Sequence, residues 1–267
     1  MNRQWCSRIW ILIALFAGAA LTGCQGLPRS DLDDNTGNLG EVDNTKKGAG
    51  ETYMQIAAHF LETGQLDLAL INAKTSLEKE PDNAQTHNII ALIYQRLGEQ
   101  ALADRHFKSA IKLQPKNSYI RNAYGAFLCA QDRFEEADQQ FQMALENPLY
   151  NTPWVALTNA GICSGRAGEL GQSEAYLRSA LRRNPTFSAA LLEMAKVSLE
   201  NEEYLSARGY LQRYLAVAQH SSESLWVGIR VERRLGDENA VASYSLMLNS
   251  GFPDSEETQL LRESTKP

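Results

Sequence analysis

Histidine and cysteine are scarce in this 267-residue chain, which has four of each. The histidines are dispersed, no two of them stand four residues apart as metal-binding pairs on a helix do, and no Cys-x-x-Cys motif occurs. Gly161 to Gly165 has the spacing of a nucleophile elbow, but its central residue is Cys163 and it lies in a predicted helix. We therefore expect no enzyme, no metal, no cofactor and no small-molecule substrate.

Dense clusters of basic residues are also missing. The chain has 26 Lys and Arg against 32 Asp and Glu, a formal net charge of −6. Nucleic-acid phosphates require clustered Lys and Arg. The two densest basic stretches, Arg178 to Arg183 and Arg230 to Arg234, are short and interleaved with apolar residues, so we interpret them as solvated helix faces. No nucleic-acid partner is expected.

The chain has one long apolar run, Ile9 to Leu21, and its 13 residues fall short of the roughly 20 that cross a bilayer as a helix. Arg3 and Arg8 precede it, and small residues follow it. This pattern favours a cleaved signal peptide, residues 1–23, over a transmembrane anchor. The tetrad from Leu21 to Cys24 resembles a bacterial lipobox, which implies that Cys24 becomes the lipidated first residue of the mature chain.

Residues 24–49 are rich in Asp, Asn, Gly and Lys, and we predict a disordered tether that begins at the lipidated Cys24. A calcium loop from Asp31 is the alternative, but Val42 stands where its closing glutamate is required. Gln25 after the cysteine resembles the sorting signal of outer-membrane lipoproteins. The expected location is the periplasmic face of the outer membrane, where acyl chains bind the lipid.

A period of 34 residues runs through the rest of the chain. Its clearest unit starts at Ala84, with small residues at positions 8, 20 and 27, a glycine at 15 and a proline at 32: Ala91, Ala103, Ala110, Gly98 and Pro115. Small residues let two helices cross closely, glycine permits the turn between them, and proline ends the second helix. The pattern resembles the tetratricopeptide repeat (TPR) consensus.

The period extends to six units, 50–83, 84–117, 118–151, 154–187, 188–221 and 222–255, followed by a C-terminal tail, 256–267. Thr152 and Pro153 interrupt it once, and Tyr214, Ile229 and Val241 replace small residues in the last two units. No stretch after residue 50 alternates apolar and polar residues, so no strand is expected. The predicted fold is all-α, a right-handed superhelical solenoid of about six TPR helix pairs.

Two cysteines remain in the mature repeats, because Cys6 leaves with the signal peptide and Cys24 carries lipid. Cys129 and Cys163 occupy positions 12 and 10 of consecutive first helices, which pack side by side in such a solenoid. In an oxidising compartment the two thiols could form a disulfide, and we favour this pairing. The alternative is a pair of small buried side chains.

Binding in TPR proteins occurs mainly through positions 2, 5, 9, 12 and 13 of each first helix. In units two to four, the candidate groove residues are Gln85, Asn88, Leu92, Gln95, Arg96, Tyr119, Asn122, Ala126, Thr158, Ile162 and Arg166. The amides of Asn88 and Asn122 share position 5 and could hold the backbone of an extended ligand. Solvated polar side chains on a concave face are the alternative for each asparagine.

The lipobox, the repeats and the run from Asn122 to Cys129 together resemble the PilF/PilW family of type IV pilus biogenesis lipoproteins, also called pilotins. The resemblance implies an outer-membrane scaffold that binds the pilus secretin and promotes its localisation and multimerisation, as pilus assembly and twitching motility require. The alternative function is a TPR lipoprotein scaffold for outer-membrane protein assembly or for cell-wall enzymes.

Overall fold

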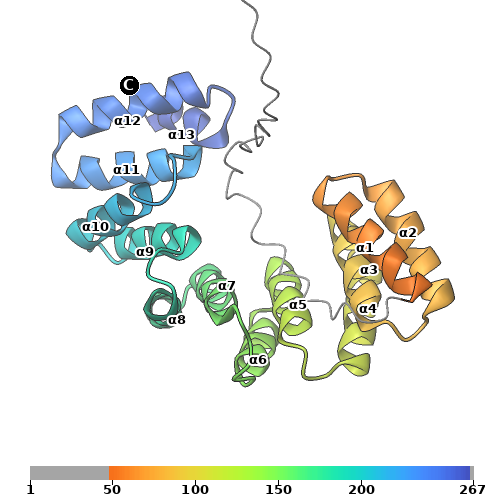
Figure 1. Cartoon of the computed structure of the whole chain (residues 1–267). Coiled ribbons are helices and arrows are strands. Elements are labelled where there is room, and N and C mark those ends of the chain that lie inside the picture. The colour runs from red at the N-terminus through yellow and green to blue at the C-terminus, as the bar shows by residue number, and fades with distance from the viewer. Residues whose placement is uncertain (1–47, 265–267) are drawn as a thin grey trace, which may run out of the picture. The chain divides into compact units, whose positions relative to one another are not determined.

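The fold is a series of antiparallel helix pairs in chain order (Figure 1). The computed structural model describes residues 48–264, and these residues form thirteen helices and no strand. The helices are α1 (Ala49–Glu62), α2 (Leu66–Lys79), α3 (Ala84–Arg96), α4 (Gln100–Leu113), α5 (Ser118–Ala130), α6 (Phe134–Leu145), α7 (Pro153–Arg166), α8 (Leu170–Arg183), α9 (Ser188–Glu200), α10 (Tyr204–Leu215), α11 (Ser222–Leu235), α12 (Glu238–Gly251) and α13 (Glu256–Ser264).

The predicted signal peptide, the lipidated Cys24 and nearly all of the tether lie outside the described residues. Within 48–264, no helix is both long and apolar enough to span a membrane. The all-α prediction is confirmed, and each of the six predicted units corresponds to one pair of helices, although α1 and α7 begin one residue before their units.

Small residues lie where the two helices of a unit cross, as the repeat pattern predicts. In the second unit, Ala91 of α3 and Ala103 and Ala110 of α4 are completely buried, and Phe107 fills the space beside them. The third unit has Gly125 at position 8, where an added Cβ would lie 2.7 Å from the ring of Phe141. The helices therefore approach closely because these positions carry almost no side chain.

The turn between the helices of each unit has a left-handed backbone at position 15. Four units have glycine there, with φ between +74° and +83°. The third and fifth units have Asp132, with φ of 56°, and Glu202, with φ of 61°. A turn of this shape forms in every unit even though two units lack the residue that adopts it without strain.

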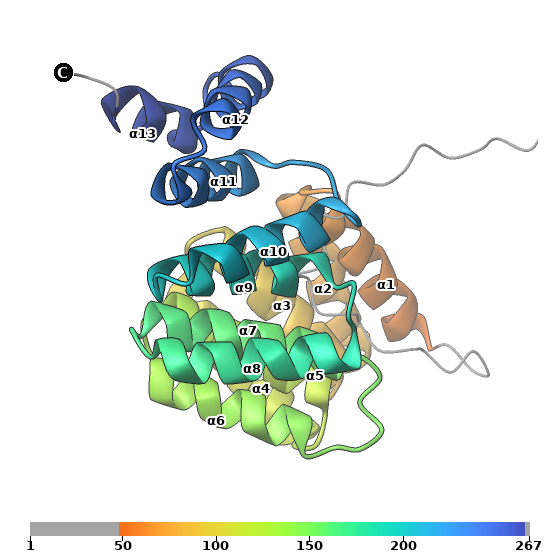
Figure 2. The same cartoon turned by 90° about the vertical axis from the view of Figure 1, so that its left-hand side faces the viewer.

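The first helices, α1, α3, α5, α7, α9 and α11, form a continuous row in which each packs on the next. Each second helix packs on its own first helix and on the first helix of the following unit. Figure 2 shows α6, α8 and α10 following one another along one side of this row. Among the described helices no second helix packs on another, so each unit is joined to the next through the following first helix, which contacts both helices of the unit before it.

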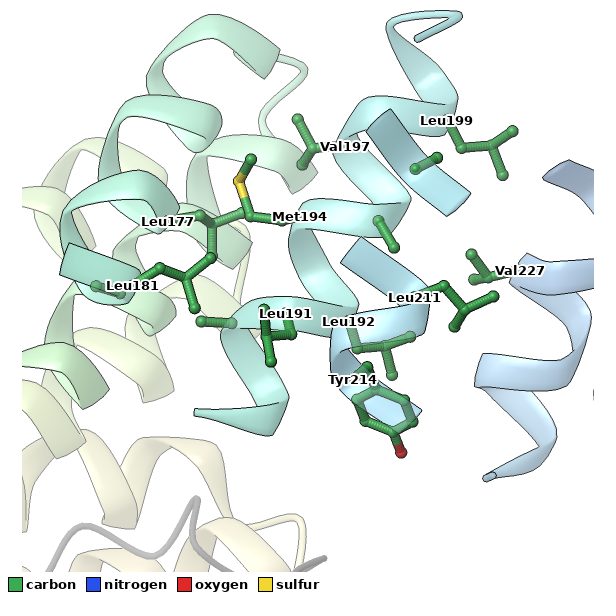
Figure 3. Close-up of a cluster of buried hydrophobic side chains, with 14 of the residues drawn as sticks. Leu177, Leu181, Leu191, Leu192, Met194, Val197, Leu199, Leu211, Tyr214 and Val227 are labelled. Carbon is green, nitrogen blue, oxygen red and sulfur yellow. The ribbon is translucent and has the colours of Figure 1, made fainter. Parts of the chain in front are cut away.

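The largest cluster of buried apolar side chains spans the fourth, fifth and sixth units (Figure 3). Met194 of α9 lies near Leu177 of α8, and Leu211 of α10 lies near Val227 of α11. Burying such side chains stabilises the fold by about 1.5–3 kcal/mol each. Tyr214, which replaces a small residue at position 27, is accommodated because its hydroxyl donates to the Gln219 carbonyl at 3.0 Å.

Helix α13 lies within the segment predicted as a C-terminal tail. It packs on both α11 and α12, as the first helix of a seventh unit would. Leu261 joins Leu225, Ile229 and Leu248 in a buried cluster, and the Thr258 hydroxyl donates to the Phe252 carbonyl at 2.7 Å. This short helix therefore covers the apolar side of the sixth unit.

Candidate protein-binding groove

The row of first helices carries the predicted groove, but in units two to four position 5 lies inside the row. Asn88, Asn122 and Thr158 are only 3%, 1% and 2% exposed. The Asn122 Oδ1 accepts a hydrogen bond at 3.0 Å from the Nδ2 of Asn159, which lies on the next first helix. The Thr158 hydroxyl donates to the Trp154 carbonyl at 2.8 Å within its own helix.

The prediction that the amides of Asn88 and Asn122 face a ligand is therefore corrected. Both side chains are buried, and Asn122 contacts the first helix of the following unit. A buried amide needs hydrogen-bond partners, and Asn122 finds its partner within the protein.

Asn88 lacks the partner that Asn122 has. Position 6 of the unit after Asn88 is Ala123, which has no amide to donate. Position 6 of the unit after Asn122 is Asn159. Within the described residues, the buried Oδ1 of Asn88 has no hydrogen-bond partner, and neither do the buried Oε1 atoms of Gln85 and Gln95 on the same helix. These three oxygens make α3 rich in unpaired acceptors.

The two arginines predicted for the groove tie neighbouring units together. The Arg96 guanidinium donates to the carbonyl of Leu61 at the end of α1. The Arg166 guanidinium donates to Asp132 Oδ1 at 2.9 Å and lies over the Phe134 ring, with its Cζ 6.0 Å from the centroid. Both side chains are partly exposed at the groove but already bind the preceding unit.

The remaining predicted groove residues form a mixed, half-buried surface. Tyr119 packs edge-on against the Tyr150 ring with centroids 5.0 Å apart. Leu92, Ala126 and Ile162 share position 9 of successive first helices and are all half-buried. This apolar line, flanked by the half-buried Gln85 and Gln95, is the part of the predicted groove that a partner can reach.

A disulfide joins Cys129 of α5 to Cys163 of α7, with Cα atoms 5.7 Å apart. Both residues are buried in the row of first helices, beside the fully buried Leu128 and Phe127. The bond links the third and fourth units covalently, across the place where two extra residues interrupt the period.

Two histidines that are 19 residues apart in the sequence meet between α3 and α4. The Nδ1 atoms of His87 and His106 lie 3.0 Å apart, and Tyr94 packs against the His106 ring. Burial, and secondarily the neighbouring His87, lowers the pKa of His106 to about 4, and burial also lowers the pKa of His87. The pair is neutral at pH 7, and residues 48–264 contain no group of three side chains that could hold a metal ion.

The sixth unit brings together residues that we did not predict as a site. Its groove positions 5, 9, 12 and 13 are Trp226, Arg230, Arg233 and Arg234, and all four line a pocket. Arg233 and Arg234 are exposed, as expected for a solvated helix face, and they also line this pocket. The same offsets that selected residues in units two to four would have found this set.

Comparisons with known proteins agree on the fold and on one family. The tetratricopeptide repeat family model matches residues 84–117. The type IV pilus assembly protein PilF of Pseudomonas aeruginosa is 30% identical over 248 residues, which cover 93% of this chain and 95% of that protein. An uncharacterized protein of Haemophilus influenzae is 30% identical over 122 residues, 46% of this chain and 68% of that protein.

Two solved structures extend this similarity to three dimensions. The crystal structure of PilW, described as a widely conserved type IV pilus biogenesis factor, has a TM-score of 0.75 and 30% identity, and the match covers 81% of this chain and 99% of PilW. A structure of Pseudomonas aeruginosa PilF has a TM-score of 0.72 and 30% identity, with 81% and 98% covered.

Proposed function

Since the chain belongs to the PilF/PilW family of type IV pilus biogenesis proteins, we propose that it is a pilotin, an outer-membrane lipoprotein scaffold that binds the pilus secretin. It promotes the localisation of the secretin in the outer membrane and its multimerisation, and pilus assembly and twitching motility depend on it. The lipid on Cys24 holds it at the periplasmic face of the membrane.

One observation carries the scaffold part of this proposal: six first helices stand in one row and present position 9 side chains along it. Half-buried apolar residues flanked by polar ones suit a protein segment, because burying them on binding removes apolar area from water. Leu92, Ala126 and Ile162 are the residues that we assign to this contact.

The lipid anchor is tested by Cys24→Ala, with Cys6→Ala as the matched control, because Cys6 lies in the part of the signal peptide that is removed. We expect Cys24→Ala to leave the outer-membrane fraction and to reduce secretin multimers on a detergent-resistant gel, with unchanged circular dichroism. Cys6→Ala should behave as wild type. Normal secretin multimers in the Cys24 variant would refute the proposal.

The groove is tested by Leu92→Glu together with Ile162→Glu, compared with Leu205→Glu on the second helix α10, where the side chain is 72% exposed. We expect only the groove variant to lose the secretin in affinity capture from outer-membrane fractions. Equal recovery would exclude this groove. Capture of cell-wall enzymes or barrel-assembly proteins in place of the secretin would favour the alternative function.

A further inference from the structure

A pocket of about 370 Å³ lies at the last unit of the array, where α9, α10, α11 and α13 meet. Its walls include three arginines of α11, Arg230, Arg233 and Arg234, and the aromatic side chains of Tyr204 and Trp226. Residues three and four apart on a helix share a face, so the three guanidinium groups gather on one side of α11.

Aromatic rings position two of these guanidinium groups. The Arg233 Cζ lies 5.9 Å from the centre of the Trp226 ring, and the Arg234 Cζ lies 5.8 Å from the centre of the Tyr204 ring. Arg233 also donates to the Ser264 hydroxyl of α13 at 3.1 Å, and Arg234 donates to the Tyr204 hydroxyl at 3.4 Å. Cation–π contacts and these hydrogen bonds hold the groups in place before any ligand arrives.

Two of these arginines have no carboxylate partner among the described residues. Arg230 pairs with Glu200 at 2.8 Å, but neither Arg233 nor Arg234 forms an ion pair with a carboxylate anywhere in residues 48–264. A guanidinium has five N–H donors in a fork that matches a carboxylate, so several donors of Arg233 and Arg234 stay available.

The pocket continues the row that carries the groove. Its residues on α11 hold groove positions 5, 9, 12 and 13, and Leu199 and Glu200 hold positions 12 and 13 of the preceding first helix. A polypeptide lying along the first helices would therefore reach the pocket. Glu200 and Glu202 also line it, and they repel a compact group with several negative charges, such as phosphate, more strongly than separate carboxylates that carry one charge each.

We propose that this pocket binds an acidic segment of a partner protein, in which two neighbouring carboxylates pair with Arg233 and Arg234 and an adjacent apolar side chain contacts Trp226 and Leu199. The proposal goes beyond secretin binding, because it assigns a second contact site with its own chemistry. It holds for whichever partner carries such a segment.

The test is isothermal titration calorimetry of the full protein with the amidated peptide Ser-Leu-Asp-Asp-Leu-Ser, which does not depend on the secretin assignment. A peptide with asparagine in place of both aspartates is the first control. We expect Arg233→Gln with Arg234→Gln to weaken binding of the acidic peptide about tenfold or more, since hydrogen bonds between charged groups are the strong ones. The asparagine peptide should bind equally weakly to both proteins.

Arg182→Gln with Arg183→Gln is the matched control protein, because it removes the same charge from an adjacent pair on α8 outside the pocket. Glu200→Gln adds a result that misfolding cannot produce: it frees Arg230, and we expect severalfold tighter peptide binding. Equal weakening by both arginine pairs would overturn the proposal, as would unchanged binding to Arg233→Gln with Arg234→Gln. Tighter binding of inorganic phosphate or of anionic phospholipid vesicles, lost with the same pair, would overturn the assignment to a protein segment.

Discussion

Removing the disulfide between α5 and α7 should lower the free energy of unfolding of this array by several kcal/mol. The double variant Cys129→Ala/Cys163→Ala opens a loop whose ends are 34 residues apart. In the chain-entropy relation, 2.1 plus 1.5R ln 34 is about 12.6 cal/mol/K, which corresponds to about 3.8 kcal/mol at 25 °C. The unfolded chain gains this freedom when the bond is absent.

The folded state adds to the loss. Both cysteines are buried and belong to the apolar cluster around Phe127, so alanine at both positions also removes packed atoms. Residual structure in the unfolded chain acts in the opposite direction, because a compact unfolded state gains less from an open loop. We expect a net decrease of about 3–4 kcal/mol in the free energy of unfolding.

Urea unfolding followed by far-ultraviolet circular dichroism measures this difference, with and without dithiothreitol. Reductant should move the wild-type midpoint towards that of the double variant and should not affect the variant. The slope of free energy against urea should rise when the bond is lost, because an unlinked chain exposes more surface. A difference below about 1 kcal/mol between oxidised wild type and the variant would refute the loop-closure reasoning.

Two further predictions concern packing and pH. Gly125→Ala should destabilise the protein by about 1–3 kcal/mol, because its Cβ would lie 2.7 Å from a buried aromatic ring. Gly209→Ala, with nothing within 4 Å of its Cβ, should stabilise the protein by about 0.5–1 kcal/mol. Chemical unfolding of the two variants measures both changes in the free energy of unfolding. The depressed pKa values of His87 and His106 mean that the unfolded state binds more protons between the unfolded pKa of about 6.5 and the folded value. The stability that the neutral histidines contribute should therefore be fully present above that range and fall on acidification from pH 7 to 5. The free energy of unfolding should fall less steeply with pH in His106→Asn. Equal slopes for the two proteins in urea titrations at several pH values would contradict this prediction.

The helix pairs could be predicted from the sequence because their signals lie within one repeat. Ala91, Ala103 and Ala110 define a crossing, and Gly98 defines the turn, without reference to any other unit. The turns at Asp132 and Glu202 have no glycine, yet the period alone places them correctly. Tertiary packing overrides the local preference at these two positions, which is why the array is regular where the sequence is not.

The burial of the predicted groove residues could not be predicted in the same way. The offset that selects Asn122 indicates a face of the helix, but the partner that buries it, Asn159, lies 37 residues further along the chain. Residues of α9, α10 and α13 complete the pocket at Arg233, and the sequence of α11 alone does not predict which helices lie against it. A repeat register thus predicts which face a side chain occupies and leaves open what covers that face.

The contacts between neighbouring units, which we call joints, differ in ways that the repeat register does not predict, and this difference affects function. Arg208 and Glu232 form an ion pair between the fifth and sixth units, whereas a disulfide joins the third to the fourth at Cys129 and Cys163. The period makes these joints equivalent, but the side chains do not. A ligand along the row of first helices crosses several joints, and among the described units only at the joint between the third and fourth does a covalent bond restrain the two first helices. If units reorient on binding, we expect larger changes at the non-covalent joints than at the joint that the disulfide links.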